Sequence, residues 1–153
     1  MLKYRKATIE DIPELVRNRV DFIKEAHKLG PDSDIAGLEK ALYEYFNETM
    51  GNDSFIAWVA IDQERIVATS GLVFYHVPPS IKNILGKVAY IMNMYTETSY
   101  RNQGIATALF EKIVAEARSR GYRRIALNAT DKGKPLYIKY GFEDTGTEMV
   151  LNL

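Results

Sequence analysis

The feature that most limits the fold of this chain is a strand-like run that leads through a glycine turn into a long amphipathic helix, between residues 89 and 107. Residues 90–95 are apolar apart from Asn93, as in a buried strand. The turn centres on Gly104, and the helix after it keeps one apolar stripe, made of Ile105, Ala108, Leu109, Ile113, Val114 and Ala117. Because the first N–H groups of a helix lack internal partners and point at one spot, this order predicts a site for an anion such as phosphate.

The chain after this helix completes a crossover unit. Gly121 ends the helix, and residues 124–130 form the next strand-like segment. A strand, a helix and a strand joined by short loops place the two strands parallel, as neighbours or nearly so. Residues 134–140 then predict a short helix capped by Gly141, and residues 142–153 predict a final pair of strands.

The N-terminal part of the chain predicts a strand and two helices. Residues 2–7 alternate like a short strand, and Thr8 is a good N-cap, with Asp11 in the place of the capping-box glutamate. Apolar side chains recur every three or four positions over residues 9–28, which indicates an amphipathic helix that Gly30-Pro31 stops.

The middle of the chain predicts one more helix and three strands. The helix spans residues 35–50, and the strands span residues 54–61, 66–77 and 88–97. Four polar residues join the first two strands, a length typical of an antiparallel hairpin. Gly71 inside the second strand predicts a bulge or a close approach of the backbone.

Composition excludes several classes of protein. The chain has no cysteine, which excludes disulfides, zinc thiolate sites and a cysteine nucleophile. Twenty basic and twenty acidic side chains cancel, and they are spread along the chain, which argues against a nucleic-acid surface. No apolar run is long enough for a signal peptide or a membrane span. We expect one cytoplasmic domain over residues 1–153, with no metal and no membrane or nucleic-acid partner, and with a homodimer left open.

Two motifs resemble the GCN5-related N-acetyltransferase (GNAT) superfamily. Residues 94–106, Met-Tyr-Thr-Glu-Thr-Ser-Tyr-Arg-Asn-Gln-Gly-Ile-Ala, are similar to the family's acyl-CoA motif, in which a strand end and a short loop lead into a helix. Residues 135–142, Pro-Leu-Tyr-Ile-Lys-Tyr-Gly-Phe, are similar to its Leu-Tyr-x-x-x-Gly-Phe segment. The resemblance implies an α/β fold, with a mixed, mainly antiparallel sheet of six to seven strands, a central parallel pair and four flanking helices.

The same resemblance implies that the chain transfers the acetyl group of acetyl-CoA to a primary amine. The start of the helix would hold the pyrophosphate, and the strand end would bond the pantetheine arm at a bulge. Arg101 would either pair with a phosphate or brace the loop against Glu97. The cofactor-binding residues expected on this basis are Met94, Tyr95, Thr96, Arg101, Asn102, Gln103, Gly104, Ile105, Ala106 and Thr107.

Catalysis requires an acid for the departing thiolate and a route for the proton of the amine. Tyr137 stands in the family's place for the acid, and a phenol is protonated at neutral pH. Its alternative role is as a packing aromatic beside Phe142. Residues 88–96 contain no carboxylate, so Glu97, Asp21 or Glu25, or a chain of water molecules, would serve as the base.

The wall that would receive the amine is the least determined part of the site. In the resembling family the first two helices and the loop after the third strand form it. The residues expected there are Asp21, Tyr45, Tyr75, His76, Tyr90 and Asn93. Such an aromatic and mildly acidic wall favours a small amine or a terminal amino group.

Two other functions compete with acetyl transfer. The first is a module that keeps the fold but only senses acyl-CoA or pairs with a protein. The second is a nucleotide-dependent Rossmann enzyme, which needs its glycine turn after an early strand and an acidic residue about 20 positions later. The turn here comes late, and Gly121, Tyr122 and Arg123 occupy that later region, which disfavours the second function.

Overall fold

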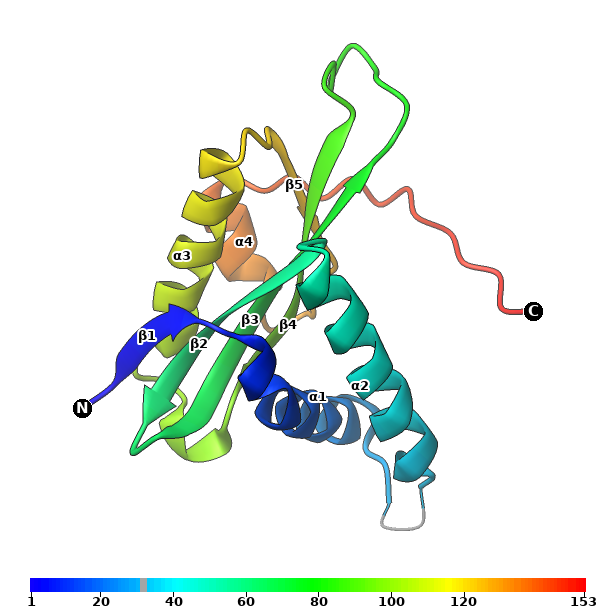
Figure 1. Cartoon of the computed structure of the whole chain (residues 1–153). Helices are drawn as coiled ribbons and strands as arrows, with labels where there is room; N and C mark the ends of the chain where they lie inside the picture. Colours follow the sequence, from blue (N-terminus) through cyan, green and yellow to red (C-terminus); the bar gives the residue numbers. More distant parts are fainter. Residues whose placement is uncertain (31–32) are drawn as a thin grey trace.

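One mixed sheet organises the molecule, as the computed structural model of residues 1–30 and 33–153 shows (Figure 1). Its strands follow the order of the chain from one edge of the sheet to the other. All neighbours are antiparallel except the last pair, which is parallel. The strands are β1 (Lys3–Lys6), β2 (Phe55–Asp62), β3 (Arg65–His76), β4 (Lys87–Thr96) and β5 (Arg124–Leu127).

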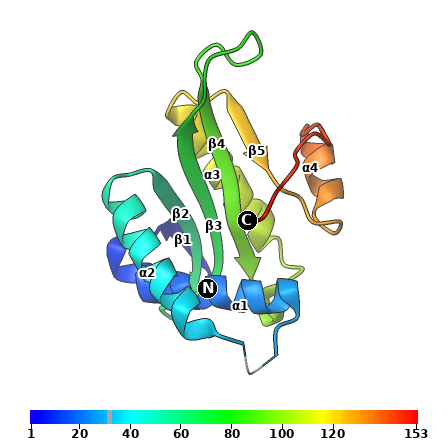
Figure 2. The same ribbon diagram turned by 90° about the vertical axis from the view of Figure 1, so that its right-hand side faces the viewer.

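Helices cover both faces of the sheet (Figures 1 and 2). Helices α1 (Ile12–His27) and α2 (Ile35–Gly51) lie on one face, α3 (Ile105–Ser119) lies on the other, and the short α4 (Lys134–Tyr140) lies beside β5. Each face has its own apolar core. Leu15 and Phe46 pack on the first face, and Leu109 and Phe110 pack on the second.

The first helical segment begins as the sequence predicts. The backbone N–H of Thr8 donates to Oδ2 of Asp11 at 2.7 Å, so the shorter acid does fill the place of the glutamate. Residues 9–11 form a 3-10 turn before α1, which is why the regular helix starts later than the periodicity suggests. The helix also ends earlier, because Lys28 takes the left-handed cap itself with φ of 50°. Gly30 lies after that cap, and the predicted stop at Pro31 lies outside the described residues.

Gly71 of β3 is closely approached by β2 and β4, and β4 contains a bulge. A Cβ atom on Gly71 would lie 2.7 Å from the ring of Phe55, which confirms the close approach that the sequence predicts. The bulge lies on the opposite strand. The pairing skips from Met92 to Tyr95 on β4, and Asn93 has a φ of 59°.

The prediction of six to seven strands with a central parallel pair is wrong. The described residues form five strands, and the parallel pair is at an edge, because β5 is the last strand of the sheet. Residues 142–153 form no strand, and β5 ends at Leu127 rather than at residue 130. The alternating pattern of the final segment favours an extended conformation, but a strand also needs a partner, and none of the described backbone supplies one.

Candidate active site

The two parallel strands separate where the sequence predicts a ligand. Strand β4 pairs with β5 only from Val88 to Ile91, and β4 continues to Thr96 while β5 ends at Leu127. The other edge of β4 keeps its partner over this stretch, since Tyr95 and Thr96 pair with β3. One edge of residues 94–96 therefore remains open for a ligand.

The direction of the backbone groups at this edge follows from the ladder. The N–H of Glu97 donates to the carbonyl of Val67 on β3 at 3.0 Å. Successive residues of an antiparallel strand turn their backbone groups alternately toward and away from the partner, so those of Thr96 point away from β3. The carbonyl of Thr96 indeed accepts a bond from Nε of Arg101 at 2.8 Å, outside the sheet. The backbone N–H of Thr96 consequently faces the open edge.

The start of α3 lies at Gly104, where the sequence predicts an anion site. Gly104 is the N-cap, with φ of 78°, a value that strains any side chain other than hydrogen. Apart from its chain neighbours and the backbone of the helix, none of the described residues has an atom within 4 Å of the place where its Cβ would be, so the space in front of the helix is open. The N–H groups of the first turn lack carbonyl partners within the helix and carry about half a positive charge.

A groove of about 760 Å³ joins the open edge of β4 to the start of α3. Nine of the ten predicted cofactor residues line it, so the fold brings these residues together. Gln103 is the exception, since its amide donates to the carbonyl of Ser99 at 3.3 Å and does not line the groove. Lining residues that the sequence did not predict include Phe22 and Ala26 of α1, Phe110 of α3, and Lys132, Gly133 and Leu136 from the loop and helix after β5.

Arg101 braces the loop, but against Glu25 rather than against Glu97. Its guanidinium donates twice to the carboxylate of Glu25, at 2.8 and 2.7 Å, and lies 5.6 Å from the centre of the Tyr95 ring. These hydrogen bonds lower the pKa of Glu25 and raise that of Arg101. The ion pair joins the end of α1 to the loop before α3 at one rim of the groove.

Glu97 lies in a different ion-pair network. Its carboxylate accepts bonds from Arg17 at 2.9 Å and from Arg65 at 2.7 Å, and its side chain is only 12% exposed. Arg17 also binds Glu14, and these carboxylates raise the pKa of its guanidinium. Glu97 does not line the groove, so its geometry is that of a brace between α1, β3 and the end of β4.

Tyr137 lies on the wall of the groove with its ring packed and its hydroxyl free. The ring contacts Phe110 and Phe142, with centroid distances of 5.6 and 5.8 Å. Within residues 1–30 and 33–153 no hydrogen bond to the hydroxyl is found. Burial raises the pKa of this phenol above its ordinary value of 10.0. Both predicted roles thus fit one side chain, since the ring packs and the protonated oxygen remains available.

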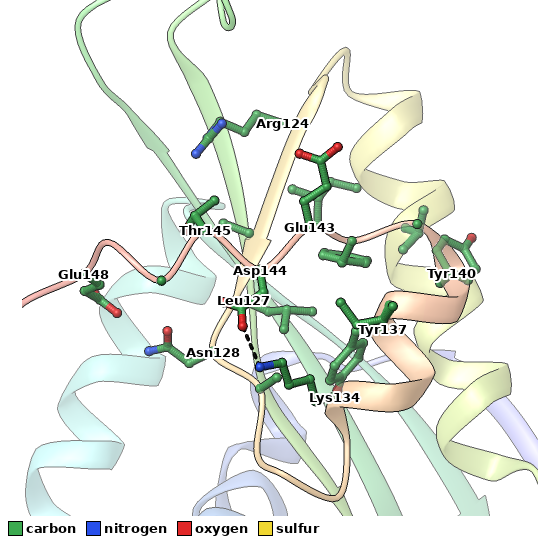
Figure 3. A pocket seen from close by; sticks show the side chains of 18 of the residues that line it. Arg124, Leu127, Asn128, Lys134, Tyr137, Tyr140, Glu143, Asp144, Thr145 and Glu148 are labelled. Atoms are coloured by element: carbon green, nitrogen blue, oxygen red, sulfur yellow. Dashed lines mark hydrogen bonds and ion pairs between the residues drawn. The ribbon is translucent and has the colours of Figure 1, made fainter.

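A second cavity of about 960 Å³ lies on the other side of Tyr137, which lines both spaces. Strand β5, helix α4 and residues 141–148 line it, and it is open to solvent on one side (Figure 3). Charged side chains line it, and Lys134 pairs with Asp144 across one end. Nothing in the sequence pattern marks this cavity, because it depends on where residues 141–148 cross β5.

The predicted acceptor residues do not all come together. Tyr75 and Tyr90 share one face of the sheet, since Val73 pairs with Tyr90, and burial, then Glu148 and Tyr75, raise the pKa of Tyr90. Glu148, which sequence reasoning did not identify, thus comes near this face. The other four predicted acceptor residues do not lie with Tyr75 and Tyr90.

Tyr45, Asp21, His76 and Asn93 lie in four different environments. Tyr45 packs in an aromatic cluster with Phe55, at a centroid distance of 5.9 Å. Asp21 pairs with Arg17 at 3.6 Å, and His76 is exposed at the end of β3. Asn93 is buried at the bulge, and neither polar atom of its amide has a hydrogen-bond partner in the described part of the chain.

Comparisons with known proteins agree with this architecture. The model of the acetyltransferase (GNAT) family matches residues 23–142. A crystal structure of a predicted acetyltransferase with acetyl-CoA from Clostridium acetobutylicum is 39% identical, with a TM-score of 0.89, and covers 99% of this chain and 96% of that one. The crystal structure of a GCN5-related N-acetyltransferase from Ralstonia eutropha is 30% identical, with a TM-score of 0.88, and the match covers 100% of this chain and 99% of that one.

Curated relatives match a smaller part of this chain than the solved structures do. N-acetyltransferase 8B of Rattus norvegicus is 32% identical over 92 residues, which are 58% of this chain and 40% of that protein. The chain therefore corresponds to less than half the length of this relative. Among the described residues no helix is long and apolar enough to cross a membrane, and no group of three or more histidine, aspartate and glutamate side chains has the arrangement of a metal site.

Proposed function

Since this chain belongs to the GNAT acetyltransferase family, we propose that it transfers the acetyl group of acetyl-CoA to a primary amine, either a small molecule or a peptide or protein amine, by direct transfer in a ternary complex. The observation that carries the proposal is the position of Tyr137. Its free hydroxyl lies on the wall shared by the groove and the second cavity, where a donor and an acceptor can meet.

The groove fits the two halves of the donor. The unpaired N–H groups at the start of α3 and the open space at Gly104 suit a pyrophosphate. The open edge of residues 94–96 suits the amide groups of a pantetheine arm, which would bond there as another strand does. The thioester would then lie between Thr96 and Tyr137.

The residues present can complete each step of the transfer. The amine nitrogen forms a bond to the thioester carbon, and the bond from that carbon to sulfur breaks. The backbone N–H of Thr96 faces the open edge of β4, whereas that of Tyr95 faces β3, so Thr96 is the donor that stabilises the carbonyl oxygen. Tyr137 donates its proton to the departing thiolate and regains one from solvent.

The proton of the amine requires a different acceptor from Glu97. Arg17 and Arg65 both donate hydrogen bonds to the Glu97 carboxylate, and Glu97 does not line the groove. We assign the removal of this proton to water in the second cavity, which is open to solvent and borders Tyr137.

Replacement of the acid tests the proposal. Tyr137→Phe keeps the ring that packs on Phe110 and removes only the hydroxyl, so turnover in a thiol-release assay should fall by about ten- to a thousand-fold with the affinity for acetyl-CoA unchanged. Tyr140→Phe is the matched control, because Tyr140 stacks edge-on against the same Phe110. Equal turnover in wild type and Tyr137→Phe would refute the role of the acid. Binding of acetyl-CoA without turnover of any amine in a broad panel would instead support the sensor function.

A further inference from the structure

One corner of the sheet lies beyond the helices that cover the rest of its face. Met92 packs in the core under α1 and α2, and Tyr90, two positions earlier on β4, turns to the same face. In Figure 2 this face points toward the viewer, with α1 and α2 below and to the left, while none of the helices in the described chain lies in front of β5. The sheet therefore offers an open surface at the start of β4 and along β5.

Polar and aromatic side chains gather on this open surface. Tyr75 of β3 and Arg124 of β5 lie in one row across the sheet, because both flank the same residue of β4. Tyr90 lies in the next row. Asn128 comes four positions after Arg124 and directly after the end of β5, so on an extended chain both turn to the same face. Figure 3 shows Arg124 and Asn128 on the side of β5 away from Tyr137.

The final segment of the chain adds a carboxylate to this surface. Residues 141–148 line the second cavity beside β5, and Glu148 does so together with Arg124 and Asn128. Figure 3 shows Glu148 on the same side of β5 as Asn128. Burial, then the charge of Glu148, raise the pKa of Tyr90, which agrees with a carboxylate near that phenol. A negative and a positive charge therefore share one face of the sheet within a single cavity.

These two charges do not neutralise each other. Among the described residues no ion pair or side-chain hydrogen bond of Arg124 or Glu148 is found, whereas Lys134 and Asp144 already pair at one end of the cavity. Opposite charges that line one cavity without pairing are complementary to a ligand that carries both. A guanidinium suits a carboxylate or a phosphate, and a carboxylate beside an aromatic ring suits an ammonium group.

We propose that the acceptor is a small zwitterion, whose ammonium group binds Glu148 beside Tyr90 and whose anionic group, a carboxylate or a phosphate, binds Arg124. This inference rests on the proposed acetyl transfer, since it names the acceptor of that reaction. Asn128 follows the point where β4 and β5 separate, so an amine held there lies next to the expected place of the thioester. The bound ammonium gives one proton to water before its nitrogen attacks, and a second proton leaves as the amide forms, while Tyr137 protonates the thiolate.

Calorimetry in the presence of CoA tests the site apart from the chemistry. The probes are propylamine, β-alanine and phosphoethanolamine, which have similar lengths, and their homologues lengthened by methylene groups. The best zwitterion should bind the wild type about tenfold more tightly than the alkylamine of the same length. The carboxylate and phosphate series compared show which anion Arg124 prefers. Alkylamines that bind as tightly as the zwitterions of both series would overturn the proposal.

Charge-removing variants test the two ends of the ligand separately. Arg124→Gln should weaken the binding of zwitterions about tenfold and leave that of alkylamines unchanged, and Arg124→Lys, which keeps the charge, should retain most of the preference. Glu148→Gln should weaken the binding of both classes. Glu143→Gln is the matched control, because Glu143 lines the same cavity but lies on the side of β5 toward α3 (Figure 3). An equal effect of Glu143→Gln and Glu148→Gln would contradict the assigned site.

Thiol release on the same preparations separates this inference from the proposed function. Acetylation of zwitterions, with a KM that Arg124→Gln raises about tenfold at an unchanged kcat, supports both. A higher kcat/KM for alkylamines than for every zwitterion overturns the inference and leaves acetyl transfer in place. Selective binding of zwitterions without acetylation of any amine overturns the proposed function, while calorimetry upholds the site itself.

Discussion

Glu97→Gln should cost stability and leave catalysis nearly intact. The carboxylate accepts bonds from Arg17 and Arg65 at 2.9 and 2.7 Å with a side chain 12% exposed, while the arginine side chains are 33% and 54% exposed. Charge-assisted hydrogen bonds contribute about 1.5–3 kcal/mol each, but the glutamine oxygen keeps one bond and solvent screens the arginines. A net loss of about 1–2 kcal/mol should lower Tm by about 2–8 °C.

The assay measures thermal unfolding and thiol release on the same preparation, below the lowered Tm. Glu111→Gln is the matched control, because Glu111 lies on the polar side of α3 and should change neither quantity. If Glu97 were the general base, its amide variant would lose about 10²- to 10⁴-fold in turnover with little change in Tm. That pattern would refute the assignment of Glu97 as a brace.

Three further expectations concern the groove, the sheet and the response to acid. Gly104→Val should abolish the binding of acetyl-CoA in calorimetry, because a branched residue at φ of 78° is strained and projects into the space before α3; retained affinity would move the anion site elsewhere. Gly71→Ala should lower the free energy of unfolding by about 1–3 kcal/mol in urea titrations, since its Cβ would lie 2.7 Å from the Phe55 ring. Arg5 lowers the pKa of Asp11, so the unfolded chain binds a proton more readily and stability should fall as pH drops below about 4; Asp11→Asn should flatten that fall.

The order of the elements and the groove could be predicted from the sequence because both depend on local patterns. The turn at Gly104 and the periodic stripe of α3 occupy adjacent residues, and the structure brings nine predicted cofactor residues together around them. The partners of Glu97 could not be predicted. Arg17 and Arg65 lie 80 and 32 positions away, and only the packing of α1 against the end of the sheet brings the three together.

The prediction of two final strands in residues 142–153 was wrong for a related reason. The alternation between residues 149 and 153 is a property of their side chains, whereas strand pairing requires a specific neighbouring strand. The available neighbour is the edge strand β5, and the sequence of β5 does not show whether another strand pairs with it. The same holds for Glu148. Its approach to Tyr90 depends on the path of residues 141–148 across the sheet, which no periodicity encodes.

The bulge at Asn93 changes the phase of β4. Side chains two apart on a regular strand share a face, yet Met92 packs in the core under α1 and α2 while Met94 packs in the core under α3. Because of this one extra residue, even-numbered side chains before the bulge face the core under α1 and α2, and even-numbered side chains after it face the core under α3. Because the pairing runs from Gly71 with Met92 to Thr69 with Tyr95, deletion of Asn93 would leave Met94 opposite Ser70 and remove the bulge, while Met94 kept its place under α3.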